Sequence, residues 1–174
     1  MFGLMKINAT SLIAGGLMLA AGGAAAQDYN PQLIGEYRDW AAWVNGSGGG
    51  KTCFIASKPK TTSPKGVNRG EIYFYVTHRP SRGIKGEVAV RIGYPFSKQN
   101  EGIIRIGSRE FALRFDGDRG WPTPASEDPR VVNAMKAGAK MTVRGISARG
   151  TKTSDSYSLL GFTAAYNAMT KACG

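Results

Sequence analysis

The sequence predicts a mainly β protein: an antiparallel β-sandwich or open barrel of about seven to eight strands with two short helices. Short segments that alternate apolar and polar residues recur along the chain, and glycine- and proline-rich turns separate them. Only two segments, near 129–137 and near 163–172, have the residue spacing of a helix. We therefore expect the helices to pack at one end of an antiparallel body.

The N-terminal segment has the pattern of a cleaved export signal. Lys6 is its only charged residue, and an apolar, small-residue run follows, in which Ala24 and Ala26 fit the small-x-small cleavage rule. A membrane anchor is the alternative, but the run is too short and too rich in glycine to cross about 30 Å of hydrocarbon. We predict a signal peptide over 1–26, a single domain over 27–174 and no transmembrane segment after cleavage.

The first half of the mature chain supplies four predicted strands after an irregular lead-in over 28–36. The first of them could instead form an amphipathic turn, and the glycine-rich sequence NGSGGG after it marks a hairpin loop. The third strand carries apolar or aromatic residues on both faces, so we expect it to be central and covered on both sides. The residues between the second and third strands, 58–70, form a predicted loop. These strands are predicted at 37–44, 52–57, 71–78 and 87–94.

The second half supplies four more strands and both helices. The residues over 121–127 are expected to be irregular because they contain two prolines. Asp128 suits the N-cap of the first helix, and Pro129 suits its first position. A polar turn over 148–155 precedes the last strand, and the closing helix places Phe162, Tyr166, Met169 and Cys173 on one face. These strands are predicted at 103–106, 110–115, 141–147 and 156–160.

The chain has two cysteines, Cys53 and Cys173. A pair of cysteines in an exported protein favours a disulfide, because the compartments outside the cytoplasm are oxidising. Two free, buried thiols are the alternative. We predict a Cys53–Cys173 bond that ties the C-terminal helix to the strand over 52–57.

No set of residues with catalytic or metal-binding spacing is evident. His78 is the only histidine, and we expect it to be a surface or hydrogen-bonding residue at a strand end. Asp155 lies among serines that we expect to cap a hairpin turn. No phosphate-binding glycine loop is present. We therefore predict no catalytic residue, no metal site and no cofactor.

The chain is basic, with a formal net charge of +11 at neutral pH. This charge favours anionic partners, although it could instead serve only to keep the protein soluble. In an exported protein the partners would be anionic envelope or host-surface components, and no nucleic-acid motif is present. The candidate basic binding surface comprises Lys51, Lys58, Lys60, Lys65, Arg69, Lys140, Arg144, Arg149 and Lys152.

Several blocks of sequence resemble the invasion-associated locus B (IalB) family. In chain order they are KTCFIASKPK from Lys51, RGEIYFYVTHRP from Arg69, EVAVRIGYPF from Glu87, VVNAMKAGAKMTV from Val131, SARGTKTSDSYSLLGFTAA from Ser147 and the terminal KACG. The resemblance implies an exported, mainly β protein of the periplasm or the outer surface, without established catalysis. The type member of the family is associated with host-cell entry.

Together these observations favour an exported, non-catalytic envelope protein that works by binding. The alternative is a periplasmic enzyme or enzyme inhibitor that acts on the cell envelope, with Asp155 and neighbouring hydroxyls in a cleft. A histidine hydrogen-bonded to Asp155 or to a serine inside a pocket would favour the enzyme. A closed body with shallow basic patches would favour the binding protein.

Overall fold

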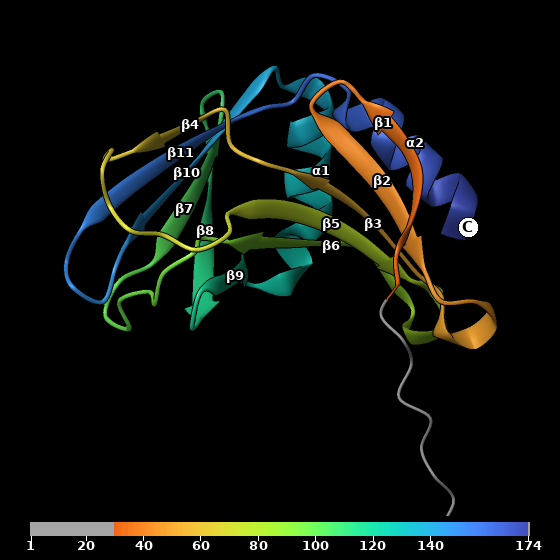
Figure 1. Cartoon of the computed structure of the whole chain (residues 1–174), viewed down its shortest axis with the longest axis horizontal. Coiled ribbons are helices and arrows are strands. Elements are labelled where there is room, and N and C mark those ends of the chain that lie inside the picture. The colour runs from red at the N-terminus through yellow and green to blue at the C-terminus, as the bar shows by residue number, and fades with distance from the viewer. Residues whose placement is uncertain (1–29, 174) are drawn as a thin grey trace, which may run out of the picture.

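The computed structural model describes residues 30–173, so the predicted signal peptide lies outside the described residues. These residues form strands and two α-helices, joined by turns and by three short 3-10 turns (Figure 1). The strands are β1 (Gln32–Tyr37), β2 (Trp40–Asn45), β3 (Thr52–Ser57), β4 (Thr61–Ser63), β5 (Tyr73–Arg79), β6 (Ile84–Arg91), β7 (Gly102–Ile106), β8 (Arg109–Asp116), β9 (Arg119–Pro122), β10 (Lys140–Ile146) and β11 (Lys152–Ser158). The helices are α1 (Asp128–Ala137) and α2 (Phe162–Cys173).

All strands belong to one open antiparallel sheet. Its order is β1-β2-β3-β5-β6-β9-β8-β7-β10-β11-β4, so that β1 and β4 form the edges within the described chain. The prediction of a mainly β, antiparallel fold with two helices is therefore confirmed. The sheet is continuous rather than divided into the two stacked sheets of a sandwich, and it has eleven strands instead of about seven to eight.

Eight of the eleven strands overlap the predicted ones, and the sequence analysis missed β1, β4 and β9. The residues of β1 were expected to be irregular. In the structure a bulge between Leu33 and Gly35 interrupts the alternation of this strand, so its sequence lacks a clear strand pattern. β4 has only three residues, all of them hydroxyl-bearing, and β9 ends in a proline. Pairing with neighbouring strands, which local pattern does not encode, stabilises all three.

The sheet bends so that its two halves face each other across the core (Figure 1). The Phe74 ring of β5 meets the Tyr157 ring of β11 with centroids 5.7 Å apart. At one end the indole N–H of Trp40 donates to the carbonyl oxygen of Ser158 over 3.0 Å. Strands that are far apart in the sheet order therefore enclose one apolar cluster.

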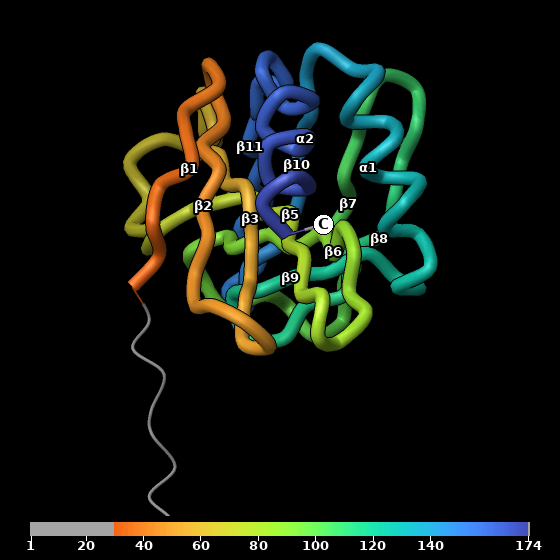
Figure 2. The backbone as a smooth tube through the Cα atoms, turned by 90° about the vertical axis from the view of Figure 1, so that its right-hand side faces the viewer, coloured from red at the N-terminus to blue at the C-terminus, as the bar shows by residue number. Residues whose placement is uncertain are grey.

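Helix α2 lies against β1, β2, β3 and β5, as the spacing of its apolar residues predicts (Figure 2). Phe162 and Met169 are fully buried, and Tyr166 is half-buried beside them. Gly161 precedes the helix with φ of +89°, where a Cβ atom would overlap the carbonyl oxygen of Tyr37. Glycine is therefore required at this position both for its backbone conformation and for the close approach of β1.

Helix α1 begins at its predicted N-cap, Asp128, one residue earlier than expected. Asp128 is the first helical residue, and its Oδ1 accepts the N–H of Val88 in β6 over 3.2 Å instead of capping its own helix. The apolar face of α1 is buried against β6, as expected from the sequence. Asp128 therefore links the helix to the sheet.

Burial, with a smaller contribution from the nearby Glu87, raises the pKa of the Asp128 carboxyl to about 6, although the hydrogen bond from the Val88 N–H acts to lower it. The unfolded chain has an aspartate pKa near 3.9. The folded state therefore holds a proton that the unfolded state releases between about pH 4 and pH 6, and the stability from this group is lost as pH rises through that window.

We predict that Asp128→Asn gains stability relative to the native protein as pH rises. The difference in the free energy of unfolding between variant and native protein should shift by about 1–2 kcal/mol in favour of the variant between pH 4 and pH 7. Solvent around this partly exposed carboxyl screens its interactions and keeps the shift below the value that the pKa difference alone would give. Urea unfolding at both pH values measures it, with Asp116→Asn, which changes an exposed carboxylate, as the control. The same difference at both pH values would contradict the prediction.

Candidate functional site

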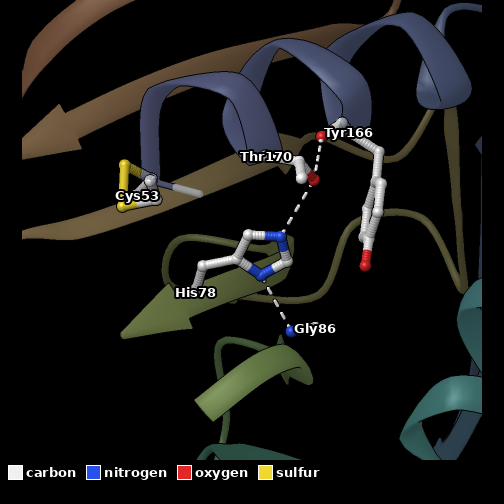
Figure 3. Close-up of a disulfide and its surroundings, with 6 residues drawn as sticks. Cys53, His78, Gly86, Tyr166 and Thr170 are labelled. Atoms are coloured by element: carbon white, nitrogen blue, oxygen red, sulfur yellow. Dashed lines mark hydrogen bonds between the residues drawn. A yellow bond between two sulfur atoms is a disulfide. The ribbon is translucent and has the colours of Figure 1, made fainter. Parts of the chain in front are cut away.

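Cys53 of β3 and Cys173 at the end of α2 form a disulfide with their Cα atoms 5.9 Å apart (Figure 3). The predicted bond is confirmed. Both residues are buried, and the bond fixes the last turn of α2 to the centre of the first half of the sheet. A buried disulfide is typical of proteins that fold outside the reducing cytoplasm.

His78 lies beside this disulfide, paired with Cys53 in the register of β3 and β5 (Figure 3). Its Nδ1 accepts the N–H of Gly86 over 2.8 Å, and its Nε2 lies 3.1 Å from the Thr170 hydroxyl. That hydroxyl donates to the carbonyl oxygen of Tyr166 over 2.9 Å, so the proton between Nε2 and Thr170 belongs to the histidine. Burial lowers the pKa of His78, in agreement with a neutral ring.

The expectation of a hydrogen-bonding histidine is therefore confirmed, although His78 is buried rather than at the surface. The hydrogen-bond partners of its ring are the Thr170 hydroxyl of α2 and the Gly86 N–H of β6, and neither Asp155 nor a serine is among them. The arrangement that would favour an enzyme is not formed at this histidine.

Asp155 was expected in a hairpin turn, but it lies within β11 and is fully buried. It accepts two hydrogen bonds from the Arg69 guanidinium, Nη1 to Oδ1 over 2.7 Å and Nη2 to Oδ2 over 2.6 Å. Arg69 also donates to the carbonyl oxygen of Ile92, and its guanidinium lies over the Tyr94 ring. Because the Arg69 side chain is only 7% exposed, it does not belong to a basic surface.

This ion pair joins segments that are distant in both sequence and sheet order. Arg69 lies in the connection from edge strand β4 to β5, Asp155 in β11, and Ile92 directly after β6. The N–H of Gly70 donates to the carbonyl oxygen of Gly93 over 2.8 Å. The connection is thereby held across the end of the bent sheet, beside a hollow of about 340 Å³ that Tyr94 and Thr153 help to line.

The other predicted basic residues lie on several elements and differ in their ion pairs. Lys58 pairs with Glu71 and Lys60 with Asp39. Lys51 lies at the start of β3, and Lys65 follows β4. The predicted basic residues that remain belong to the β10–β11 hairpin, and we refer to them as the hairpin cation patch: Lys140, Arg144, Arg149 and Lys152.

The hairpin cation patch is exposed, and no ion pair involves it within residues 30–173. Lys140 and Arg144 occupy outward positions of β10, and Lys152 begins β11 on the same face. The other outward positions of the two strands carry Thr, Ile and Ser residues, without a carboxylate. These cations are therefore available to an anionic partner.

A second outward-facing cluster was not recognised from the sequence. The alternation of Tyr73 and Tyr75 suggested a strand covered on both faces, but both helices pack on the inner face of β5 and β6 (Figure 2). The outer face carries half-buried rings from four strands, and we refer to these rings as the aromatic face: Trp43, Phe54, Tyr73, Tyr75 and Trp121. The sequence signal that could have revealed this face is the recurrence of aromatic residues at alternate positions of its strands.

Within the described part of the chain, no group of His, Cys, Asp and Glu side chains could hold a metal ion. Likewise, none of the helices described over residues 30–173 has the length and apolar character needed to cross a membrane.

Residues 118–170 match the family model of the Invasion associated locus B (IalB) protein. This part of the chain is similar to the IalB family. The IalB match runs from β9 almost to the end of α2, and it includes Asp155, Tyr166 and Thr170. His78 and Arg69 lie outside it and contact Thr170 and Asp155 inside it, whereas both cysteines of the disulfide lie outside the matched region. No curated protein and no solved structure matches the chain.

Proposed function

We propose that this protein is an exported, non-catalytic component of the cell envelope, in the periplasm or at the outer surface, that binds an anionic membrane surface. The hairpin cation patch is the observation that carries the proposal. Its cations are exposed, unpaired within the described chain and free of neighbouring carboxylates on the same strand face. The disulfide and the IalB match support an envelope location.

The physical basis is long-range attraction between fixed cations and lipid phosphates. Each Lys or Arg close to an anionic membrane contributes about 1 kcal/mol, and the attraction falls off within a Debye length. The hairpin presents its cations without a backbone ordering cost, because neighbouring strands hold β10 in the sheet. Association with host cells, which the family name suggests, would use the same attraction.

We predict that the full-length mature protein binds phosphatidylglycerol vesicles and that Lys140→Ala, Arg144→Ala and Lys152→Ala together lower its affinity by about two orders of magnitude. Three cations at about 1 kcal/mol each give this factor. Vesicle co-sedimentation at low and at physiological salt measures it, and binding should weaken as salt rises.

The matched control combines Lys51→Ala, Lys58→Ala and Lys85→Ala, which removes the same charge from strand β6 and from the two residues that flank β3, away from the hairpin in the sheet order. An equal loss in both triple variants would mean that net charge, rather than the hairpin cation patch, drives binding. Equal binding to uncharged phosphatidylcholine vesicles, or binding insensitive to salt, would contradict the proposal.

A further inference from the structure

Four of the five rings of the aromatic face form a continuous row across the outer side of β2, β3 and β5. Trp43 and Phe54 stack with centroids 6.5 Å apart and planes 13° from parallel. Phe54 meets Tyr75 at 6.4 Å, and Tyr75 meets Tyr73 at 5.6 Å. The row is therefore held in place by ring contacts between β2, β3 and β5 while each ring stays partly open to solvent.

A hollow of about 460 Å³ lies beside this row, between β3 and β9. Phe54 and Tyr75 line one side, Trp121 lines another, and Thr52 and Thr77 add hydroxyls. The hollow lies on the face opposite both helices, since all its strand residues are in outward positions except Val90. It combines flat apolar surfaces with hydrogen-bonding groups, as ligand sites do.

The charges of the hollow leave one cation without a partner. Arg79 pairs with Glu87 over 2.7 Å, and Arg91 pairs with Asp118 over 2.7 Å. Arg119 is exposed, and no carboxylate within residues 30–173 pairs with it. The hollow therefore carries excess positive charge at Arg119 and complements a ligand with an acidic group.

We propose that the hollow and the aromatic face form a binding site for an acidic oligosaccharide. Sugar rings have apolar C–H faces that stack on aromatic rings, hydroxyls that both donate and accept, and, in uronic acids, a carboxylate for Arg119. This surface is distinct from the hairpin cation patch, so the inference goes beyond the proposed function.

The polarity of the hollow favours a saccharide over a protein partner. Charged groups are depleted at the centre of protein interfaces, because they lose water without full compensation. Here Arg79, Glu87 and Arg91 lie within the hollow, and the exposed large aliphatic side chains of the described chain, Leu33, Val67 and Leu160, do not line it. Sugar hydroxyls can satisfy such charged groups.

The length of the face suits an extended ligand. From Trp43 on β2 to Trp121 on β9 there are four steps between neighbouring strands. At about 4.8 Å for each step, the rings span roughly 19 Å along the sheet. A second hollow of about 480 Å³, lined in part by Trp43, Lys58 and Tyr73, extends the face beyond the ring row.

The test is calorimetric titration of the full-length mature protein with an oligogalacturonate and with its neutral methyl ester. We expect the native protein to bind the acid more tightly than the ester. Arg119→Ala should lower the affinity for the acid about tenfold, because it removes one charge-assisted contact, and should leave ester binding unchanged. Trp121→Ala should weaken binding of both.

Arg109→Ala, which removes another exposed arginine outside the hollow, is the matched control and should bind like the native protein. An equal loss in Arg109→Ala and Arg119→Ala would overturn the inference, as would undetectable binding of the saccharide. Binding of single-stranded DNA as tightly as the saccharide would also overturn it, because nucleobases stack on such rings as well.

The proposals for the two binding surfaces can be tested independently of each other. The triple variant of the hairpin cation patch should retain saccharide binding, and Arg119→Ala should retain vesicle binding. If Trp121→Ala does not fold, Arg119→Ala still decides the question, because Arg119 is exposed and pairs with no described carboxylate.

Discussion

Replacing both Cys53 and Cys173 by alanine should lower the free energy of unfolding by about 4–5 kcal/mol. The disulfide joins residues 120 positions apart, so it restricts the unfolded chain strongly, and loops of this length correspond to about this value in the chain-entropy model. The loss is large because single domains are stable by only about 5–15 kcal/mol. We also expect the last turn of α2 to open, since the bond fixes Cys173 to β3.

Urea unfolding of the native protein, with and without reductant, and of the alanine variant measures this effect. The reduced native protein should be about as unstable as the variant, and reductant should not affect the variant. A loss below about 1 kcal/mol would show that the packing of Phe162 and Met169 holds α2 in place without the bond.

Removal of one partner of the Arg69–Asp155 pair should cost about 3–5 kcal/mol, because an unpaired charge would remain buried. Asp155→Leu leaves the Arg69 guanidinium in a site that is 7% exposed, and Arg69→Met leaves the carboxylate in a site that is 1% exposed. Denaturant unfolding of each single variant measures the loss. Since the pair joins the β4–β5 connection to β11, amide exchange should also increase in that connection.

The double variant Arg69→Met, Asp155→Leu should lose less stability than either single variant, because no buried charge then remains. It should still be less stable than the native protein, since the carbonyl oxygen of Ile92 loses its donor. Arg79→Met is the matched control, and it should cost at most about 1 kcal/mol because its ion pair with Glu87 is about one-third exposed. Losses that simply add in the double variant would contradict a coupled pair.

These two cross-links differ in how far the sequence could reveal them. The disulfide was predictable because the chain has only two cysteines and an export pattern, which together specify the bond without any geometry. The chain has many arginines and aspartates, so composition does not single out Arg69 and Asp155. The polar residues around Asp155 suggested a turn, but β11 extends through them because β4 and β10 pair with it on both sides.

The two surfaces differ in the same way. The hairpin cation patch was contained in the predicted basic residues. The ion pairs of Lys58, Lys60 and Arg69, and the positions of Lys51 and Lys65 outside the β10–β11 hairpin, separated it from the rest. The aromatic face was missed because alternation shows that a strand has two faces but not which face the helices cover. Tyr73 and Tyr75 are outward because α1 and α2 both pack on the other side.

The sequence by itself determined the mainly β, antiparallel character of the fold, both helices, eight of the strands and the pairing of the cysteines. Each of these depends on local alternation, helical spacing, turn residues or a unique pair of side chains, all of which are written in short stretches of chain. Only the tertiary structure decided the strand order, the three short strands, the Arg69–Asp155 pair and the outward position of the aromatic rings. Each of these depends on which distant segments meet, and many alternative partners satisfy the same local pattern.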